Sequence, residues 1–185
     1  MPDHRNVIAR SLACLFVGFL SVSMLHAQAT PTASRQGSAQ VGVAVTAVKP
    51  DYGQTYIEGL SIYGDLDVTR HLGVEAVYQN ASLRTPLDIG ENAYLIGPRI
   101  RTTRGRFIPY AKFLFGEGTF NYQQGYNIRA FSESHFMYAF GAGVDVRATR
   151  RINVRLFDFE YQRWPGYGPH GLTPYAVSVG AAYAF

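Results

Sequence analysis

Hydrophobic and polar residues alternate with a period of two along most of the chain. Such alternation is typical of β-strands that have one apolar face and one polar face. It predicts eight strands, over residues 40–48, 57–69, 72–79, 93–102, 107–118, 136–147, 151–162 and 173–185. Each is about ten residues long, close to the ~9–11 residues that a tilted strand needs to cross a bilayer.

The seventh predicted strand changes phase halfway along its length. Apolar residues take the even positions up to Leu156 and the odd positions from Phe157 onwards. A β-bulge near Leu156 or Phe157 explains such a slip, and a change of face at the membrane edge is the alternative. Beyond the slip, we expect Asp158 and Glu160 to join the polar face of the strand.

The links between strands alternate in length. Short polar links cover residues 69–71, 103–106 and 148–151, and longer links cover 49–55, 80–92, 121–134 and 163–172. Short periplasmic turns and longer external loops are typical of transmembrane β-barrels. Because every backbone N–H and C=O group needs a partner in hydrocarbon, an open sheet edge is not tolerated there. The sequence therefore predicts an all-β protein of the bacterial outer membrane, folded as a closed antiparallel up-and-down transmembrane β-barrel of eight strands.

The two faces of the strands differ in size as well as in polarity. The polar face is rich in Gly, Ala and Ser, which suit a narrow lumen, whereas the apolar face carries Phe, Tyr, Leu and Val. We therefore expect the apolar face to contact lipid, the alternative being a soluble barrel or sandwich with this face inside. Aromatic residues expected at the membrane interfaces are Tyr78, Tyr94, Tyr161, Trp164 and Tyr175 near the long loops and Phe107, Tyr183 and Phe185 near the short turns.

This orientation places charged residues of both signs in the lumen. Confined carboxylates and cationic groups form hydrogen-bonded ion pairs, so we expect a network that plugs the barrel. A selective path for small solutes is the alternative interpretation. The predicted lumen charge network consists of Asp65, Asp67, Glu75, Arg99, Arg101, Lys112, Asp145, Arg147 and Arg155.

The N-terminal segment has the pattern of a secretory signal peptide. Two arginines precede an apolar run of 14 residues, 12–25, which is followed by Ala27-Gln28-Ala29. The run is shorter than the ~20 residues of a membrane-spanning helix, although a retained anchor and a lipoprotein signal at Cys14 are alternatives. We expect a signal peptide over residues 1–29, with cleavage after Ala29 or Ala27, and a barrel domain over residues 30–185.

Composition limits the chemistry of the predicted barrel. The only cysteine is Cys14, so a chain cleaved after Ala29 would form neither disulfides nor thiolate metal sites. The formal charge is +4 and the basic residues are scattered among acids, which argues against a nucleic-acid partner. The densest basic spots, Arg104/Arg106 and Arg150/Arg151, are interpreted as solvated turns.

Several segments resemble the OmpA-type outer-membrane β-barrel family. They are the first strand with Val41-Gly42-Val43, the Gly-rich segment 140–147, the phase-shifted segment 152–161, and the final strand with Tyr183 and Phe185. The resemblance implies the barrel fold, contact with outer-membrane lipid and recognition of the C-terminal strand by the barrel-assembly machinery. No peptidoglycan-binding domain follows the barrel, so the resemblance does not support a role in tethering the cell wall.

No set of residues forms a convincing active site. The histidines outside the predicted signal peptide, His71, His135 and His170, lack the spacing of a metal site, and no cofactor is expected. Some eight-stranded outer-membrane barrels modify lipid A with a His and a Ser near the outer leaflet. His135 with Ser132 or Ser134 is the nearest analogue here.

The long loops are the better place to look for function. Exposed aromatic and cationic side chains suit contacts with an extracellular ligand, and they equally suit anchoring at lipid headgroups. The candidate contact residues are Trp164, Tyr167 and His170. We therefore expect a non-enzymatic barrel with an envelope-structural or surface-loop interaction role. A narrow small-solute channel and an outer-leaflet lipid-modifying enzyme are the alternatives.

Overall fold

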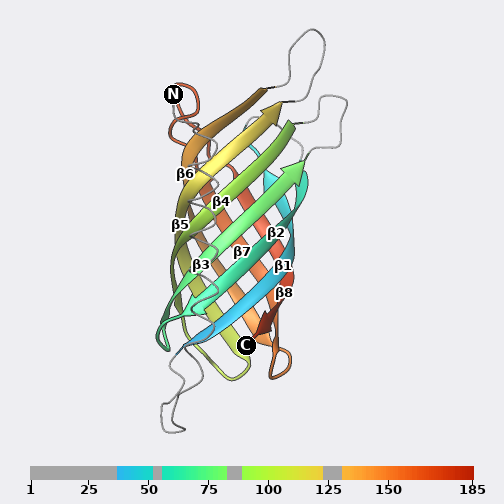
Figure 1. Ribbon diagram of the computed structural model, residues 1–185, viewed down its shortest axis with the longest axis vertical. Helices are drawn as coiled ribbons and strands as arrows, with labels where there is room; N and C mark the ends of the chain where they lie inside the picture. Colours follow the sequence, from blue (N-terminus) through green and yellow to red (C-terminus); the bar gives the residue numbers. More distant parts are fainter. Residues whose placement is uncertain (1–36, 52–55, 83–88, 123–130) are drawn as a thin grey trace, which may run out of the picture. The chain divides into compact units, whose positions relative to one another are not determined.

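The computed structural model describes residues 37–51, 56–82, 89–122 and 131–185. Its eight strands lie where the alternation predicts them (Figure 1). No helix in the described residues is long and apolar enough to cross a membrane. The predicted signal peptide lies outside the described residues. The strands are β1 (Ser38–Lys49), β2 (Ile57–Asp67), β3 (Leu72–Ser82), β4 (Ile89–Arg101), β5 (Phe107–Tyr122), β6 (Phe131–Arg147), β7 (Ile152–Arg163) and β8 (Tyr175–Ala184).

The strands form one closed antiparallel barrel. Each strand pairs with the next in sequence, and β8 pairs with β1 from Gln40↔Ala184 to Lys49↔Tyr175. The closure gives every strand two neighbours, so no strand has a free edge whose N–H and C=O groups would face hydrocarbon. The predicted fold of eight strands in up-and-down order is confirmed.

Two of the predicted long loops are shorter in the structure. The segments 80–92 and 121–134 are partly strand, because β3 continues to Ser82, β4 begins at Ile89, β5 reaches Tyr122 and β6 begins at Phe131. Polar pairs hold these extensions together, as in the bond from Ser132 Oγ to Asn121 Oδ1 of 2.8 Å. Water can surround both faces of a strand outside the hydrocarbon, so the apolar alternation fades there although the pairing continues.

The bulge predicted in the seventh strand is confirmed. Val144 of β6 lies opposite Phe157, whereas Asp145 lies opposite Arg155, so Leu156 is the extra residue. Leu156 and Phe157 are both exposed on the outer wall. The bulge reverses the parity of β7, that is, which of the odd- and even-numbered residues face the lumen. The even-numbered residues that follow the bulge therefore point into the barrel.

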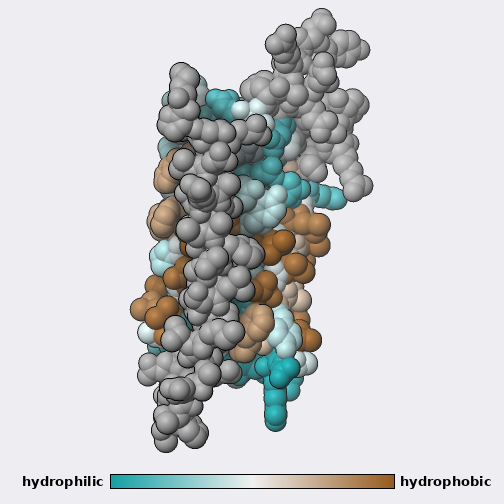
Figure 2. Space-filling view, in the orientation of Figure 1, coloured by the Kyte–Doolittle hydropathy of each residue, from teal (hydrophilic) through white to brown (hydrophobic). Residues whose placement is uncertain are grey.

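The apolar face of the sheet points outward, as predicted. Valine, leucine, isoleucine and phenylalanine side chains are exposed on all the strands, with Val43 61% and Leu60 65% exposed. Figure 2 shows hydrophobic residues gathered around the middle of the barrel and hydrophilic residues towards both ends. This distribution is that of a wall which lies against lipid.

Glycines on the inner face provide the space for large side chains on neighbouring strands. Gly42 lies opposite Tyr63, and Gly143 lies opposite Tyr110. A Cβ atom on either glycine would overlap the facing tyrosine ring. In the same way, Gly141 lies opposite Lys112. The small residues of the polar face therefore allow large tyrosine and lysine side chains to lie across a narrow lumen.

Candidate functional site

Charged side chains from six strands meet inside the barrel. Each comes from an inward-facing position of its strand, so the alternation of side chains, together with the bulge in β7, directs it into the lumen. All are buried, and they form one continuous set of ion pairs. We call this set the ionic layer; it consists of Asp65 of β2, Glu75 of β3, Arg99 of β4, Lys112 of β5, Asp145 of β6 and Arg155, Asp158 and Glu160 of β7.

Arg155 lies at the centre of the ionic layer and is 2% exposed. Its guanidinium contacts Glu75 and Asp145 at 3.1 Å, Asp158 at 3.2 Å and Asp65 at 3.4 Å. Arg99 also contacts Asp65, with its Nη1 atom 2.7 Å from Oδ2. A buried charge is stable only with such partners, because removal from water costs several kcal/mol for each ion. The two arginines therefore join strands on opposite sides of the lumen.

Two tyrosine rings lie against these guanidinium groups. The Cζ atom of Arg155 is 3.6 Å from the ring centroid of Tyr63, and that of Arg99 is 3.9 Å from the centroid of Tyr110. A planar guanidinium stacks on an aromatic face and keeps its edge N–H groups for carboxylates. Each arginine is thus held on its face and on its edge.

Lys112 occupies the position that a metal ion could otherwise take. Oxygen atoms of Glu75, Asp158 and Glu160 lie within 4.8 Å of one another, close enough to share a cation. The Nζ atom of Lys112 lies 2.7 Å from each of the three carboxylates. The protein's own ammonium group therefore binds all three carboxylates, and Arg155 supplies a second positive charge to Glu75 and Asp158.

The lumen network extends towards the short turns through one further pair. Arg101 contacts Asp67 with Nη2 and Oδ2 2.9 Å apart. Arg147 was also predicted to belong to the network, but the prediction is wrong for this residue. Its side chain is exposed at the end of β6, and it has no ion pair among the described residues. Parity directs Arg147 to the inner side, but the strand ends there and water reaches the side chain.

Apolar side chains fill the lumen closer to the long loops. On β5, for example, Leu114 and Phe120 follow Lys112, and Trp164 comes directly after the last residue of β7. These residues are packed into one buried cluster. We call the set of Leu95, Leu114, Phe120, Met137 and Trp164 the apolar layer.

The prediction that Trp164 lies at the membrane interface and contacts a ligand is wrong. Its side chain is 1% exposed, and its ring lies 4.7 Å from that of Phe120 inside the barrel. A Cβ atom on Gly118 would overlap the indole ring, so this glycine leaves the room for it. The phase slip in the sequence could have predicted this position. Beyond the bulge, the even-numbered residues of β7 face inward, and Trp164 continues this series directly after the strand.

The loop after Trp164 has a defined conformation. Its backbone pairs Trp164 with Leu172, and Gly168 and Gly171 adopt the positive φ values of 58° and 68° that favour glycine. Thr173 donates from its hydroxyl to Asp51 at 2.8 Å, which joins the loop to the end of β1. Of the predicted contact residues on this loop, Tyr167 is half-buried beside the apolar layer and His170 is exposed.

His135 and the nearby serines lie on opposite faces of β6. The ring of His135 is turned inwards, 3.3 Å from Glu133 and in edge contact with Tyr167. Ser134 lies on the outer face, where its hydroxyl is 2.8 Å from that of Thr119, and Ser132 has the same parity. Nucleophilic catalysis requires a base within hydrogen-bond reach of the hydroxyl. The structure brings no such pair together from these residues.

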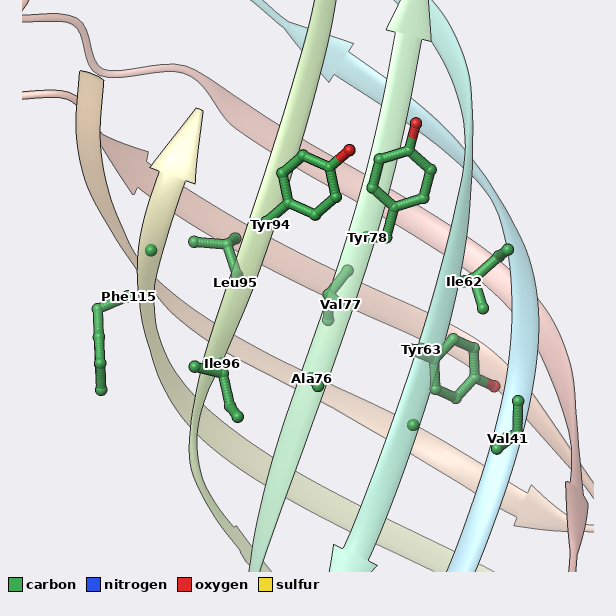
Figure 3. A pocket seen from close by; sticks show the side chains of 12 residues that line it. Val41, Ile62, Tyr63, Ala76, Val77, Tyr78, Tyr94, Leu95, Ile96 and Phe115 are labelled. Carbon is green, nitrogen blue, oxygen red and sulfur yellow. The ribbon is translucent and has the colours of Figure 1, made fainter. Parts of the chain in front are cut away.

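The outer wall has a shallow hollow over β1 to β5, seen in Figure 3. Its volume is about 510 Å³, and none of its lining residues is charged. Tyr78 and Tyr94 lie side by side at one edge, with ring centroids 4.8 Å apart. An apolar hollow that opens on the lipid-facing wall suits hydrocarbon chains and not a polar substrate.

Known proteins share this architecture at low sequence identity. Neisserial surface protein A has 13% identity and a TM-score of 0.63, with 81% of this chain and 97% of that chain covered. Ail of Yersinia pestis, solved with the heparin analogue sucrose octasulfate, has 18% identity and a TM-score of 0.55, with 80% of this chain and 97% of that chain covered. The N-terminal β-barrel domain of Pseudomonas aeruginosa OprF has 12% identity and a TM-score of 0.56, with 81% of this chain and 100% of that chain covered.

Comparison of the sequence itself identifies a family but no individual relative. No match is found among curated proteins. The chain matches the outer membrane protein beta-barrel domain family over residues 13–185, which is almost its whole length. Together with the closed barrel and its apolar outer wall, this match shows that the chain belongs to the outer membrane protein β-barrel family and is a bacterial outer-membrane protein.

Proposed function

We propose that this protein is a non-enzymatic barrel that acts through its outer surface, in an envelope-structural or surface-contact role. The observation that carries this proposal is the closure of the lumen by two successive layers. Arg155 spans the ionic layer, and Trp164 and Phe120 fill the space beyond it. A solute would have to separate buried ion pairs and then displace packed rings, so the lumen is a poor route for transport.

Conductance across a planar lipid bilayer tests this proposal. The full-length protein should insert without stable conductance steps, because both layers block the lumen. A matched variant with both layers weakened, Lys112→Ala combined with Trp164→Ala, should conduct if it stays folded, and thereby shows that insertion was successful. Stable steps from the unchanged protein would overturn the proposal.

A narrow cation path is the second candidate function. The observation in its favour is an excess of acids, since Asp67 and Arg101 bring the described lumen network to six carboxylates and four cationic groups. A conducting lumen of this composition would prefer cations over anions. The bilayer experiment decides between the two candidates, because only the channel predicts conductance from the unchanged protein.

The loop after Trp164 is our candidate for the surface that contacts an extracellular partner or the lipid headgroups. A loop already fixed in one conformation loses little conformational entropy on binding. Labelling of cysteine variants with a membrane-impermeant maleimide in intact cells tests its exposure. We expect His170→Cys to be labelled and Thr103→Cys, in the short turn after β4, to be protected until the outer membrane is permeabilised. The reverse pattern would contradict this assignment.

The C-terminal strand is proposed as the signal for the barrel-assembly machinery. Tyr183 and Phe185 both face outward, and their rings are in edge contact with centroids 5.3 Å apart. We expect Phe185→Ala to lower the fraction of heat-modifiable folded barrel in the outer membrane, with Phe157→Ala on the same wall as the control. Equal folded fractions for both variants would reject this role.

A lipid-modifying activity is the weakest of the alternatives, because His135 and the serines of β6 are separated. We expect His135→Ala to leave the lipid A of the host unchanged. A lipid A modification that the unchanged protein produces and this variant loses would restore the enzyme hypothesis.

A further inference from the structure

The three short turns concentrate arginine residues at one end of the barrel. They carry no acidic residue, and the C-terminal carboxylate lies at the same end (Figure 1). We call these side chains the arginine ring; they are Arg70 after β2, Arg104 and Arg106 after β4, and Arg147, Arg150 and Arg151 at and after the end of β6, and all six are exposed. The residues thought to be merely solvated turns thus belong to a larger cationic surface.

The arginine ring is free of internal ion pairs within the described part of the chain. Asp67, the last residue of β2 and three residues before Arg70, is buried and already paired with Arg101. Arg151 donates a hydrogen bond from Nη1 to the hydroxyl of Tyr183 at 3.0 Å, which places it against the outer wall. The remaining donors of the six guanidinium groups are available to a partner.

The opposite end of the barrel has a different charge. In the described residues, its exposed side chains include Asp51, Glu58, Glu117 and Glu133. Among the described residues of this end, the cationic ones are Lys49 and Arg163, and both are half-buried. The arginine ring is therefore a local feature and not the result of a uniformly basic surface.

The arginine ring borders the apolar wall on all three turns. Arg106 is followed by Phe107 and Arg151 by Ile152, and Arg70 lies two residues before Leu72. Phe107, Ile152 and Leu72 are exposed on the lipid-facing side. In a membrane, the headgroup phosphates lie at this boundary. A guanidinium binds phosphate through two parallel hydrogen bonds, in addition to the charge attraction.

We propose that the arginine ring binds the phosphate groups of anionic phospholipids in the periplasmic leaflet of the outer membrane. The turns of such barrels are periplasmic, which places the ring in that leaflet. The inference rests on the membrane location of the barrel and not on the proposed surface role. The border with the apolar wall favours a lipid over an acidic polymer of the periplasm, which would not need the wall.

Lipid selectivity of the full-length protein in phosphatidylcholine vesicles tests the proposal. Electron spin resonance compares how much spin-labelled phosphatidylglycerol and spin-labelled phosphatidylcholine is immobilised at the barrel. Contact with one arginine is expected to favour the anionic lipid by about fivefold. The variant Arg104→Gln/Arg106→Gln/Arg150→Gln/Arg151→Gln should lose most of this preference, whereas the same positions changed to Lys should keep most of it.

Matched controls separate the ring from the charge of the protein as a whole. The variant Lys49→Gln/Arg163→Gln, at the opposite end, should keep the preference, and a heat-modifiability gel verifies that each variant is folded. Salt at 1 M should weaken the preference of the unchanged protein, because the screening length falls to ~3 Å. No preference in the unchanged protein, or an equal preference in the four-glutamine variant, would overturn the proposal.

One further outcome would redirect the inference. The same proteins in neutral detergent are mixed with purified peptidoglycan and sedimented. The unchanged protein could sediment with peptidoglycan while the four-glutamine variant does not, and neither could show a lipid preference. This result would show that the arginine ring binds an acidic wall polymer, and the lipid proposal would be rejected.

Discussion

The ionic layer and the apolar layer close the same lumen by different physical means. In the ionic layer, each group depends on a few directional partners, and Arg155 alone contacts four carboxylates. In the apolar layer, contacts are numerous and weak, and what counts is the filled volume around Trp164. The first layer should therefore be sensitive to the loss of a single partner, and the second to a change in size.

The largest effect is expected from Arg155→Met. The change leaves Glu75 and its neighbouring carboxylates buried beside a missing cation. We expect the free energy of unfolding to fall by about 3–5 kcal/mol. Urea unfolding in lipid vesicles, followed by circular dichroism, measures it. Arg150→Met in an exposed turn should change stability by no more than about 0.5 kcal/mol, and similar losses in both variants would contradict the special position of Arg155.

Trp164→Ala is expected to have the next largest effect, a loss of about 3 kcal/mol, because the ring leaves a cavity beside Phe120. Trp164→Phe retains most of the packing and should lose less than about 1.5 kcal/mol. The same unfolding measurement compares them. If the alanine and phenylalanine variants were equally stable, filled volume would not be what stabilises the apolar layer.

Gly118→Val tests the space that this glycine leaves for the indole. The added side chain must displace Trp164, so we expect a loss of about 1–3 kcal/mol. The same change should cost much less when combined with Trp164→Ala, which removes the overlapping ring. A double-mutant cycle measures this difference, and simple additivity of the two changes would argue against the contact.

The smallest effect is expected at Thr46, which has neutral partners. Its hydroxyl lies 2.8 Å from that of Ser178 and 3.1 Å from that of Ser61, and the side chain is fully buried. Thr46→Val should lower stability by about 1 kcal/mol, since neutral hydrogen bonds contribute less than ionic ones. A loss as large as that of Arg155→Met would remove the distinction between ionic and neutral partners.

The alternation of hydrophobic and polar residues made most of the fold predictable from the sequence. The period of two placed the eight strands and separated the lipid-facing residues from the lumen residues. The phase slip at Leu156 located the bulge and brought Asp158 and Glu160 into the network. These features follow from local geometry, since neighbouring side chains on a strand point to opposite faces.

The rest depends on relations between strands, which the alternation does not contain. Arg155 contacts Glu75, 80 residues away, because the strands are staggered around the barrel. The same limit applies to Arg147, whose exposure depends on where the barrel ends. Trp164 is a different case, because its inward direction follows from the same slip that was used for Asp158.

The arginine-rich turns also bear on how the barrel can sit in its membrane. Drawing one arginine to the middle of a bilayer costs about 2–4 kcal/mol, and three separate hairpins carry such residues at the same end. Turning the finished molecule upside down would require all of them to cross together. The direction acquired during insertion is therefore permanent for the lifetime of the folded protein.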